Sequence, residues 1–185
     1  METASTPIAR YSRGAVALHW IIALLIMLNF AAAWVAEDLP KPDRAQIMGN
    51  HKAIGITILV LTVLRIVWRL MHKSPPLVET LKAWEAALAK VVHALLYVLM
   101  LAIPISGWGM SSAFTKGEPI SIFGLFNFPA LPVPYDKPTQ GMFHELHEIT
   151  ANLMIVLFVL HVGAALKHHL LDKDGTMRRM APWMK

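Results

Sequence analysis

The chain has 185 residues, of which 56% are hydrophobic and 16% charged, whereas a typical soluble domain carries about 25% charged residues. This balance excludes an ordinary soluble enzyme, and it excludes a disordered or acidic tail protein. Cysteine is absent, which excludes disulfides, thiolate metal sites, iron–sulfur clusters and haem attached through a C-x-x-C-H motif. Nine histidines remain as possible nitrogen ligands.

Four apolar stretches come close to the roughly 20 residues that a helix needs to span a bilayer. They run approximately from Ala15 to Ala36, Ala53 to Met71, Val91 to Met110 and Ile149 to Leu171. The first is longer than the roughly 7–15 apolar residues of a signal peptide, so we expect a permanent helix. The pattern predicts an all-α, four-helix transmembrane bundle, with residues 1–185 forming a single domain.

Basic residues indicate the orientation of this bundle. Of the 17 lysines and arginines, twelve fall on the side of the N-terminus, and the opposite side has Lys41, Arg44, Lys52, Lys116 and Lys137. The positive-inside rule therefore predicts that both termini are cytoplasmic. Topology explains the net charge of +5. The basic residues form no patch interleaved with aromatic residues, so we expect the lipid bilayer as a partner and no nucleic acid.

Two connections have patterns of their own. Between the second and third stretches, apolar residues repeat at helical spacing at Leu77, Leu81, Trp84 and Leu88, which predicts a short helix lying in the cytoplasmic interface. The segment from about Ser111 to Gly141 is rich in proline and aromatic residues. We expect it to lack regular structure and to fold back over the outer ends of the helices.

The histidines can be sorted by depth and by helix face. His147 and His161 are 14 residues apart, which advances a helix by about 21 Å and returns to nearly the same face. Two sites at different depths are therefore expected, each with a partner on another helix. His51, at the outer end of the second helix, matches His147, and His19, near the inner end of the first, matches His161.

Two bis-histidine sites about 20 Å apart suit two b-type haems, because each macrocycle takes one axial nitrogen above and one below. Without cysteine, the haems would be held non-covalently in the bundle core. Arg65 lies 14 residues after His51, at the inner level, and Arg69 follows one turn later. Either arginine could pair with a haem propionate, or both could extend to the cytoplasmic interface.

Alternative roles for the histidines stay open. A lone histidine in an apolar run can simply be hydrogen-bonded to a neighbouring helix, although four that pair by depth favour ligation. His144, three residues before His147, could compete as the outer ligand. His93 could replace His19 as an inner ligand, or lie beside the inner haem as a proton or quinone contact; we favour the second role.

Several motifs in order resemble the bacterial cytochrome b561 family, the small four-helix di-haem proteins of the inner membrane. They are Tyr11-Ser12-Arg13, Leu18-His19-Trp20, Asp43-Arg44, Leu64-Arg65, Arg69-Leu70, Pro75-Pro76, Ile103-Pro104-Ile105-Ser106-Gly107, His147-Glu148-Ile149-Thr150-Ala151-Asn152, Leu160-His161, Ala164-Ala165-Leu166 and His168-His169. The resemblance covers nearly the whole chain. It implies His19 and His161 as ligands of the inner haem, and His51 and His147 as ligands of the outer one.

The resemblance also implies a function. Family members pass electrons between the two haems and a membrane quinone, and some oxidise superoxide at the periplasmic face and reduce ubiquinone. Candidate residues for steering superoxide, which could equally be solvated loop residues, are Arg44, Lys52, Lys116 and Lys137. Candidates for a quinone or proton contact near the inner haem are His93, Lys167 and His168.

Two other functions stay open at this point. In the first, the chain is a cytochrome b subunit that relays electrons from a periplasmic dehydrogenase or hydrogenase to quinone. In the second, it is a non-redox carrier or structural membrane protein. A b-type haem spectrum would separate the redox functions from the last, and a protein electron donor would distinguish the relay subunit from a superoxide oxidase.

Overall fold

The computed structural model describes residues 10–76, 81–181 and 183–184, and most of them are helical. Four long helices account for the architecture: α1 (Arg13–Glu37), α2 (Lys41–Met71), α3 (Ala83–Phe114) and α4 (Lys137–Lys167). Each belongs to a segment long and apolar enough to cross a membrane. The expectation of a mainly helical bundle, with four helices long and apolar enough to span a membrane, is confirmed.

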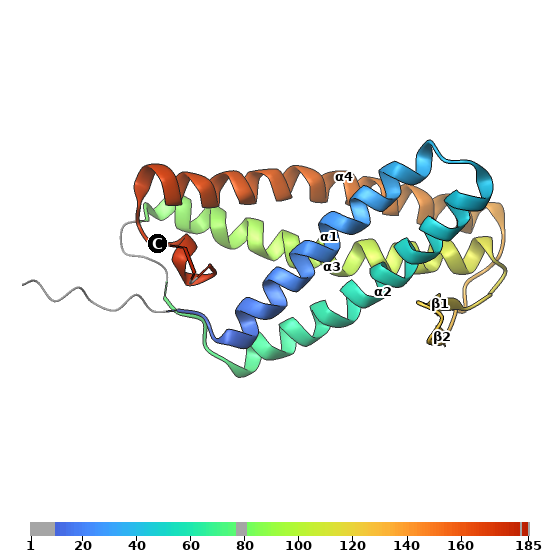
Figure 1. Cartoon of the computed structure of the whole chain (residues 1–185), viewed down its shortest axis with the longest axis horizontal. Coiled ribbons are helices and arrows are strands. Elements are labelled where there is room, and N and C mark those ends of the chain that lie inside the picture. The colour runs from blue at the N-terminus through green and yellow to red at the C-terminus, as the bar shows by residue number, and fades with distance from the viewer. Residues whose placement is uncertain (1–9, 77–80, 182, 185) are drawn as a thin grey trace, which may run out of the picture.

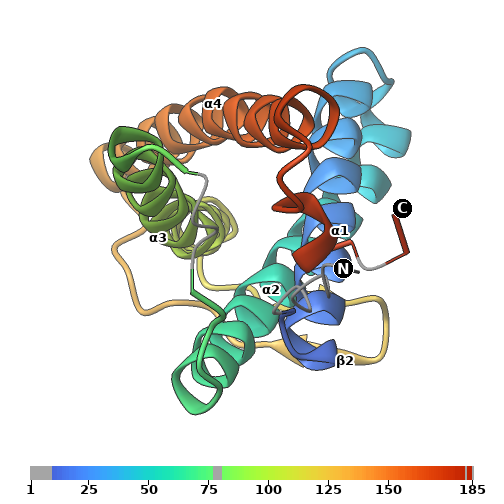
Figure 2. The same ribbon diagram turned by 90° about the vertical axis from the view of Figure 1, so that its left-hand side faces the viewer.

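The helices run along the long axis of the molecule (Figure 1). Seen from one end, α1 lies beside α2 and α3 beside α4 (Figure 2). The described chain begins and ends at the same end of the bundle as the α2–α3 connection, as four successive crossings require. The other end carries the α1–α2 turn and the α3–α4 connection.

The helices extend beyond the apolar stretches because polar residues form their first turns. The Asp136 carboxylate accepts a hydrogen bond from the Thr139 backbone N–H at 2.8 Å, so α4 begins twelve residues before Ile149. Pro40 occupies the N-cap position of α2. Apolar content locates the membrane-embedded part of a helix, whereas caps and prolines set its first residue.

The expected interfacial helix between the second and third spans is not confirmed. Trp84 and Leu88 lie in the first turns of α3 itself, and Leu81 precedes that helix. Leu77 is outside the described residues. The helical spacing continues directly into the third span, so it marks the polar beginning of α3.

The expectation that the α3–α4 connection lacks regular structure was wrong. It contains two short antiparallel strands, β1 (Ile120–Ile122) and β2 (Phe126–Phe128). Phe123 and Gly124 between them have φ values of 51° and 75°, as a tight turn with two left-handed residues requires. Prolines 129, 132 and 134 come after the strands and leave their ladder intact.

This connection does fold back onto the bundle. Trp108 Nε1 of α3 donates a hydrogen bond to the Pro129 carbonyl at 2.9 Å. The Leu131 N–H donates to Ser112 Oγ, also at 2.9 Å. Ile120 and Ile122 are buried in an apolar cluster with Ala53 and Ile56 of α2. The hairpin therefore covers the end of the bundle where α2 and α3 lie together.

The chain after α4 lies at the end of the bundle away from the hairpin. A one-turn π-helix, η1 (His168–Asp172), and a short 3-10 helix, η2 (Met177–Arg179), follow α4. Trp20 Nε1 donates a hydrogen bond to the Met180 carbonyl at 2.7 Å, and its ring lies 5.4 Å from that of Trp183. The C-terminal segment thus packs against the start of α1.

The apolar core occupies the middle of the bundle. Its buried members come from all four helices: Ile22, Ile58, Leu99, Met100, Met154 and Leu157. Large apolar side chains on the outer surfaces, such as Leu24, Val60, Val98 and Val156, are about half exposed. That arrangement suits helices surrounded by lipid, because lipid tails are as apolar as the side chains that meet them.

Candidate functional site

Two pairs of histidines face each other across the bundle at two levels. His19 of α1 and His161 of α4 have ring centroids 6.3 Å apart. His51 of α2 and His147 of α4 have the same separation, 6.3 Å. The interplanar angles are 73° and 78°, so the two rings of each pair are nearly perpendicular. The structure therefore brings together all four histidines in the pairs that depth predicts.

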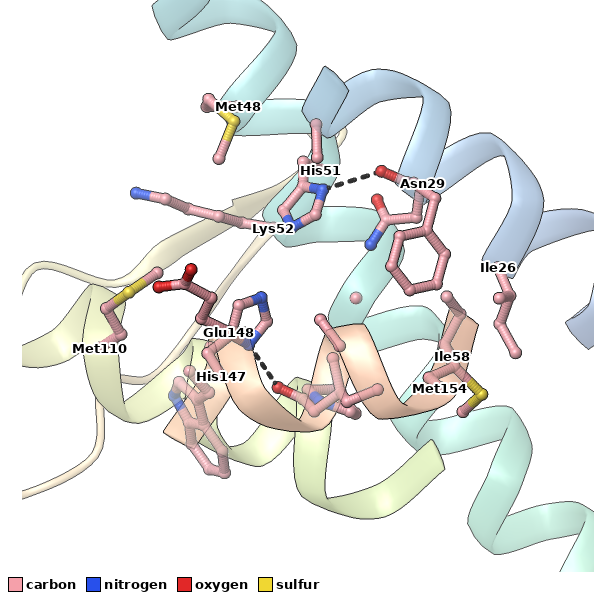
Figure 3. Close-up of a pocket in the computed structure, with 18 of the residues that line it drawn as sticks. Ile26, Asn29, Met48, His51, Lys52, Ile58, Met110, His147, Glu148 and Met154 are labelled. Atoms are coloured by element: carbon pink, nitrogen blue, oxygen red, sulfur yellow. Dashed lines mark hydrogen bonds between the residues drawn. The ribbon is translucent and has the colours of Figure 1, made fainter. Parts of the chain in front are cut away.

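The His51–His147 pair has both Nδ1 atoms engaged by backbone carbonyls. His51 Nδ1 lies 3.1 Å from the Asn29 carbonyl oxygen, and His147 Nδ1 lies 2.9 Å from that of Ile103 (Figure 3). A carbonyl can only accept, so each Nδ1 carries the proton. The Nε2 lone pairs are left for a metal.

A cavity of about 350 Å³ lies beside this pair, and all four helices contribute to its lining. Apolar residues form most of its wall, and Arg44 is among its charged residues. Two others, Lys52 and Glu148, are shown in Figure 3. The side-chain oxygen of Asn29, a residue that also lines the cavity, is buried and has no hydrogen-bond partner among the described residues. The cavity therefore suits a large, mainly apolar ligand with a few polar groups.

Two of the four cations predicted to steer a substrate belong to this cavity. Arg44 and Lys52 line it, whereas Lys116 and Lys137 do not appear in its lining. Lys116 follows α3 in a left-handed backbone conformation, and Lys137 is the first residue of α4. Sequence position could not distinguish the two cations that line the cavity from the two that do not, because all four lie on the same side of the bundle.

The His19–His161 pair has a different environment. Arg65 Nη1 lies 3.0 Å from His19 Nδ1, and Arg65 Nε donates a hydrogen bond to the Tyr97 hydroxyl, also at 3.0 Å. The guanidinium groups of Arg65 and Arg69 lie 5.4 Å and 5.5 Å from the centroid of the Tyr97 ring. Tyr97 thus holds both arginines at the level of the inner pair.

His93 shares this level. Its ring centroid is 5.3 Å from that of His161, nearer than the ring of His19. At the other level, His144 interacts with Glu148, with Nδ1 3.8 Å from the carboxylate and both side chains more than half exposed. His147, not His144, is the residue whose ring faces His51.

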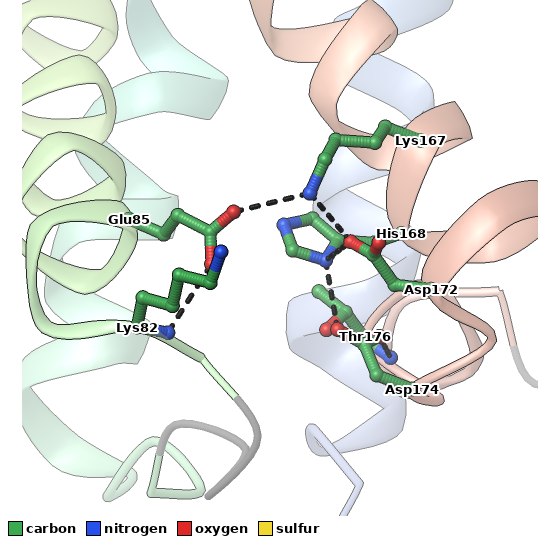
Figure 4. Close-up of polar contacts among 7 residues, drawn as sticks. All are labelled: Lys82, Glu85, Lys167, His168, Asp172, Asp174 and Thr176. Atoms are coloured by element: carbon green, nitrogen blue, oxygen red, sulfur yellow. Dashed lines mark hydrogen bonds and ion pairs between the residues drawn. The ribbon is translucent and has the colours of Figure 1, made fainter.

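Lys167 and His168 belong to a polar network beyond the inner pair (Figure 4). Lys167 Nζ lies 3.0 Å from Glu85 Oε1 and 2.6 Å from Asp172 Oδ2. His168 Nδ1 lies 3.0 Å from Asp172 Oδ2 and 2.7 Å from Asp174 Oδ2. The network connects the beginning of α3 to the segment that follows α4.

Asp174 is the ionised group that this network stabilises. Burial by itself would raise the pKa of its carboxyl group, but hydrogen bonds from Thr176 and the neighbouring His168 hold that pKa below its ordinary value. The Thr176 backbone N–H donates to Asp174 Oδ1 at 2.9 Å. The carboxylate therefore stays charged at neutral pH and anchors the C-terminal segment.

Comparison with known protein families matches residues 10–183 to the family described as prokaryotic cytochrome b561. The chain belongs to this family. Cytochromes b561 are membrane electron-transfer proteins, and the cytochrome b type implies haem b. The four apolar helices and the prokaryotic family fit a multi-pass protein of a bacterial inner membrane.

Individual relatives match over nearly their whole length. Cytochrome b561 homolog 2 of Escherichia coli K12 is 36% identical over 183 residues, which cover 97% of this chain and 95% of the relative. Cytochrome b561 homolog 1 of the same organism is 30% identical, covering 95% and 99%. A protein of Yersinia pestis named probable superoxide oxidase CybB is also 30% identical, covering 94% and 96%.

The residues of this cytochrome b561 chain fit haem b. Metal–imidazole nitrogen bonds are about 2 Å long, so an iron between two axial histidines puts their ring centroids about 6 Å apart. Both pairs have this spacing. The apolar cavity beside His51 and His147 and the orphaned amide oxygen of Asn29 agree with a bound group at that level.

Sequence reasoning missed several residues of these sites. Tyr97 lies four residues after His93, on the same face of α3, and that spacing could have found it. The carbonyls of Asn29 and Ile103 carry no sequence signal, because every residue has one. Asp174 precedes Thr176 in a turn, where acidic residues are common.

Proposed function

We propose that this cytochrome b561 is a di-haem oxidoreductase that oxidises superoxide at the outer face and reduces ubiquinone at the inner face of the bacterial inner membrane. The observation that carries the proposal is the repetition of one geometry. Two histidine pairs, at two levels of one bundle, have the same 6.3 Å ring separation. One bound haem b at each level would supply a one-electron carrier near each face of the membrane.

The axial ligands follow from the ring separations. His51 and His147 would hold the outer haem, and His19 and His161 the inner one. His93 is 5.3 Å from His161, which is short for two rings that share an iron. We therefore assign His93 as a neighbour of the inner haem and not as its ligand.

The chain's other residues would orient the two groups. The carbonyls of Asn29 and Ile103 fix the outer imidazoles with Nε2 free. Arg65 and Arg69, held against Tyr97, would neutralise haem propionates at the inner level. Because the surroundings exclude water, an unpaired charge there would be costly, and pairing with a cation offsets that cost.

The orientation of the chain in the membrane decides which histidine pair faces which side. With both termini in the cytoplasm, as the distribution of lysine and arginine indicates, the His51–His147 level faces the periplasm. Residues 1–185 would act as one unit, because helices α1, α2 and α4 each contribute ligands to the proposed sites. The bilayer separates the two faces, so electrons cross it within a single chain.

Two observations support superoxide as the electron donor: positive charge at the outer cavity, and the name of a relative. Arg44 and Lys52 line the outer cavity, where positive charge would concentrate a small anion. The relative from Yersinia pestis bears the name probable superoxide oxidase. Each superoxide that loses one electron becomes dioxygen, so no proton donor is needed at this face.

Ubiquinone reduction at the inner face requires both electrons and protons. One ubiquinone takes up two electrons and two protons, so two superoxide anions are oxidised for each ubiquinol formed. His93 lies beside the inner histidine pair, and the network of Lys167 and His168 lies between that pair and the cytoplasmic solvent. These residues are our candidates for contacting the quinone or delivering its protons.

The direct test uses the purified protein with its haems. Superoxide is generated enzymatically, and the absorbance of reduced haem b is followed before and after ubiquinone is added. We expect superoxide to reduce the haems and ubiquinone to reoxidise them. Reduction that requires a co-purified dehydrogenase or hydrogenase would contradict superoxide as the donor and support a relay subunit, and absence of a b-type spectrum would contradict both functions.

A further inference from the structure

The geometry points to Ser106 as a positioning residue for His147. We infer that Ser106, together with the Ile103 carbonyl and Gly107, fixes the tautomer and ring orientation with which His147 meets the outer haem. This inference rests on the proposed function, because it takes His147 as an axial ligand. It adds residues of α3, a helix that contributes no ligand, to the outer site.

Three polar contacts join these groups. Ser106 Oγ donates a hydrogen bond to the Ile103 carbonyl oxygen at 2.9 Å. The same oxygen accepts from His147 Nδ1, also at 2.9 Å. Ser106 Oγ itself lies 3.3 Å from His147 Nδ1. The hydroxyl can therefore donate to the carbonyl and accept from the imidazole at once.

Ser106 is a buried polar residue in an apolar helix. Ser106 is 1% exposed, although it lies in a membrane-spanning helix where an apolar residue would pack at lower cost. Its hydroxyl already has a partner in its own helix, the Ile103 carbonyl. The bond to Ile103 already satisfies the hydroxyl as a donor within α3. The contact between Oγ and His147 Nδ1 is therefore not needed to satisfy the serine.

Gly107 closes the third side of the histidine ring. A Cβ atom at this position would lie 2.9 Å from His147 Cε1 and 3.1 Å from Nδ1, which is closer than atoms in contact normally come. The helix backbone of α3 can approach the ring only because this residue lacks a side chain. The turn from Ile103 to Gly107 therefore holds the ring by hydrogen bonds and by steric contact.

The inner pair has no equivalent among the described residues. There, His19 Nδ1 faces the Arg65 guanidinium, which can only donate. His51, the partner of His147, is held by a single carbonyl. His147 is thus the one proposed ligand with both a carbonyl and a hydroxyl at Nδ1 in the part of the chain that the structure describes.

Ring orientation has a spectroscopic consequence. The His51 and His147 planes are 78° apart. When two axial imidazole planes are nearly perpendicular, two d orbitals of ferric low-spin iron become close in energy, and the EPR signal becomes strongly anisotropic. Rotation of one ring changes that splitting. The EPR signal of the outer haem should therefore report what Ser106 does, independently of electron-transfer activity.

The experiment compares purified, oxidised protein carrying its haems by EPR, with an optical redox titration of the same samples. The H147A variant identifies the outer component as the signal that it loses. We expect S106A to keep both haems but to shift the EPR position and the midpoint potential of that component alone. G107A should shift it further or remove it, because the added methyl group displaces the ring.

Two variants serve as controls. S106T retains a hydroxyl and should keep the wild-type signal. S111A removes another buried serine of α3, one without a hydrogen bond to His147, and should change neither component. An outer component that is unchanged in S106A would overturn the inference, whatever G107A shows.

The outcomes also separate this inference from the proposed function. If H147A retains both haems, the ligand assignment itself fails. If H147A loses one component but S106A behaves as S111A does, only the role of Ser106 is contradicted. A shift of both components in S106A would likewise contradict positioning, because it would indicate a general change in packing.

Discussion

The Arg65 guanidinium of α2 lies 3.0 Å from Nδ1 of His19 of α1, so a permanent positive charge lies against one proposed ligand of the inner haem. Nδ1 of each outer ligand instead donates to a neutral carbonyl. Carbonyl acceptors make an imidazole a more electron-rich ligand, whereas a nearby cation favours the reduced state of a redox centre. The two levels therefore have opposite electrostatic surroundings.

The R65Q variant tests this asymmetry. In general, a unit charge about 8 Å from a redox centre, at an effective dielectric constant of about 20, is worth about 2 kcal/mol. Solvent near the cytoplasmic end reduces that value, so we expect the inner haem potential to fall by tens of millivolts, where about 59 mV is a tenfold change. Redox titration followed by absorbance measures both components.

Arg69 provides the matched control for Arg65. Its guanidinium also lies over the Tyr97 ring, at 5.5 Å, but it makes no hydrogen bond to His19. R69Q should therefore lower the inner potential less than R65Q does. Equal shifts in the two variants, or a shift of the outer component, would contradict a specific role for the Arg65–His19 contact.

Charge at the outer cavity should control the rate of superoxide oxidation. Arg44 and Lys52 line the cavity. We expect R44Q and K52Q each to lower the second-order rate constant for haem reduction by superoxide several-fold at low ionic strength. The difference from wild type should diminish as salt screens the charges over about 10 Å at 0.1 M. Stopped-flow absorbance measures this rate.

Lys116 and Lys137 are matched controls, because they carry the same charge on the same side of the bundle outside the cavity lining. K116Q and K137Q should change the rate much less. If all four substitutions slow the reaction equally, the net charge of that face controls the rate and the cavity has no special part.

The acidic anchor of the C-terminal segment makes stability depend on pH. The Asp174 carboxyl has a lowered pKa in the folded state, so its ionised form contributes stability at neutral pH. The D174N substitution removes this charge and should lower the free energy of unfolding by about 1 kcal/mol, typical of a charge-assisted hydrogen bond after solvent screening. Thermal unfolding in detergent should show a melting temperature lowered by a few degrees at pH 7.

The sign of this effect follows from the lowered pKa. The contribution of Asp174 is fully present above the ordinary aspartate pKa of about 3.9 and is lost as pH falls through the folded value below it. The gap between wild type and D174N should thus be constant near neutrality and close in acid. A gap that widens in acid would contradict this account.

Much of the fold could be predicted from apolar content, since four lipid-exposed helices require long apolar runs. The helix starts could not, because Asp136 and Pro40 begin helices outside those runs. The hairpin around Phe123 was also missed. Its strands have only three residues each, too few for an alternating pattern to stand out beside five prolines.

The histidine pairs could be predicted because a 14-residue step fixes both depth and face on one helix. Contacts between helices follow no such period. Ser106 approaches His147 because α3 packs against α4, and Tyr97 meets Arg65 because α3 packs against α2. Neither contact can be read from one helix alone. Which cations line the cavity likewise depends on how the α1–α2 turn and the hairpin fold back.

The central claim is that two histidine pairs hold one haem each, and haem content measured on purified protein tests it most directly. A pyridine haemochrome assay with a protein determination gives the haem-to-protein ratio for wild type, H147A and H161A. We expect a ratio of two for wild type and one for each variant, with different haems retained in the two variants. An unchanged ratio in either variant, or loss of the same haem in both, would contradict the pairing.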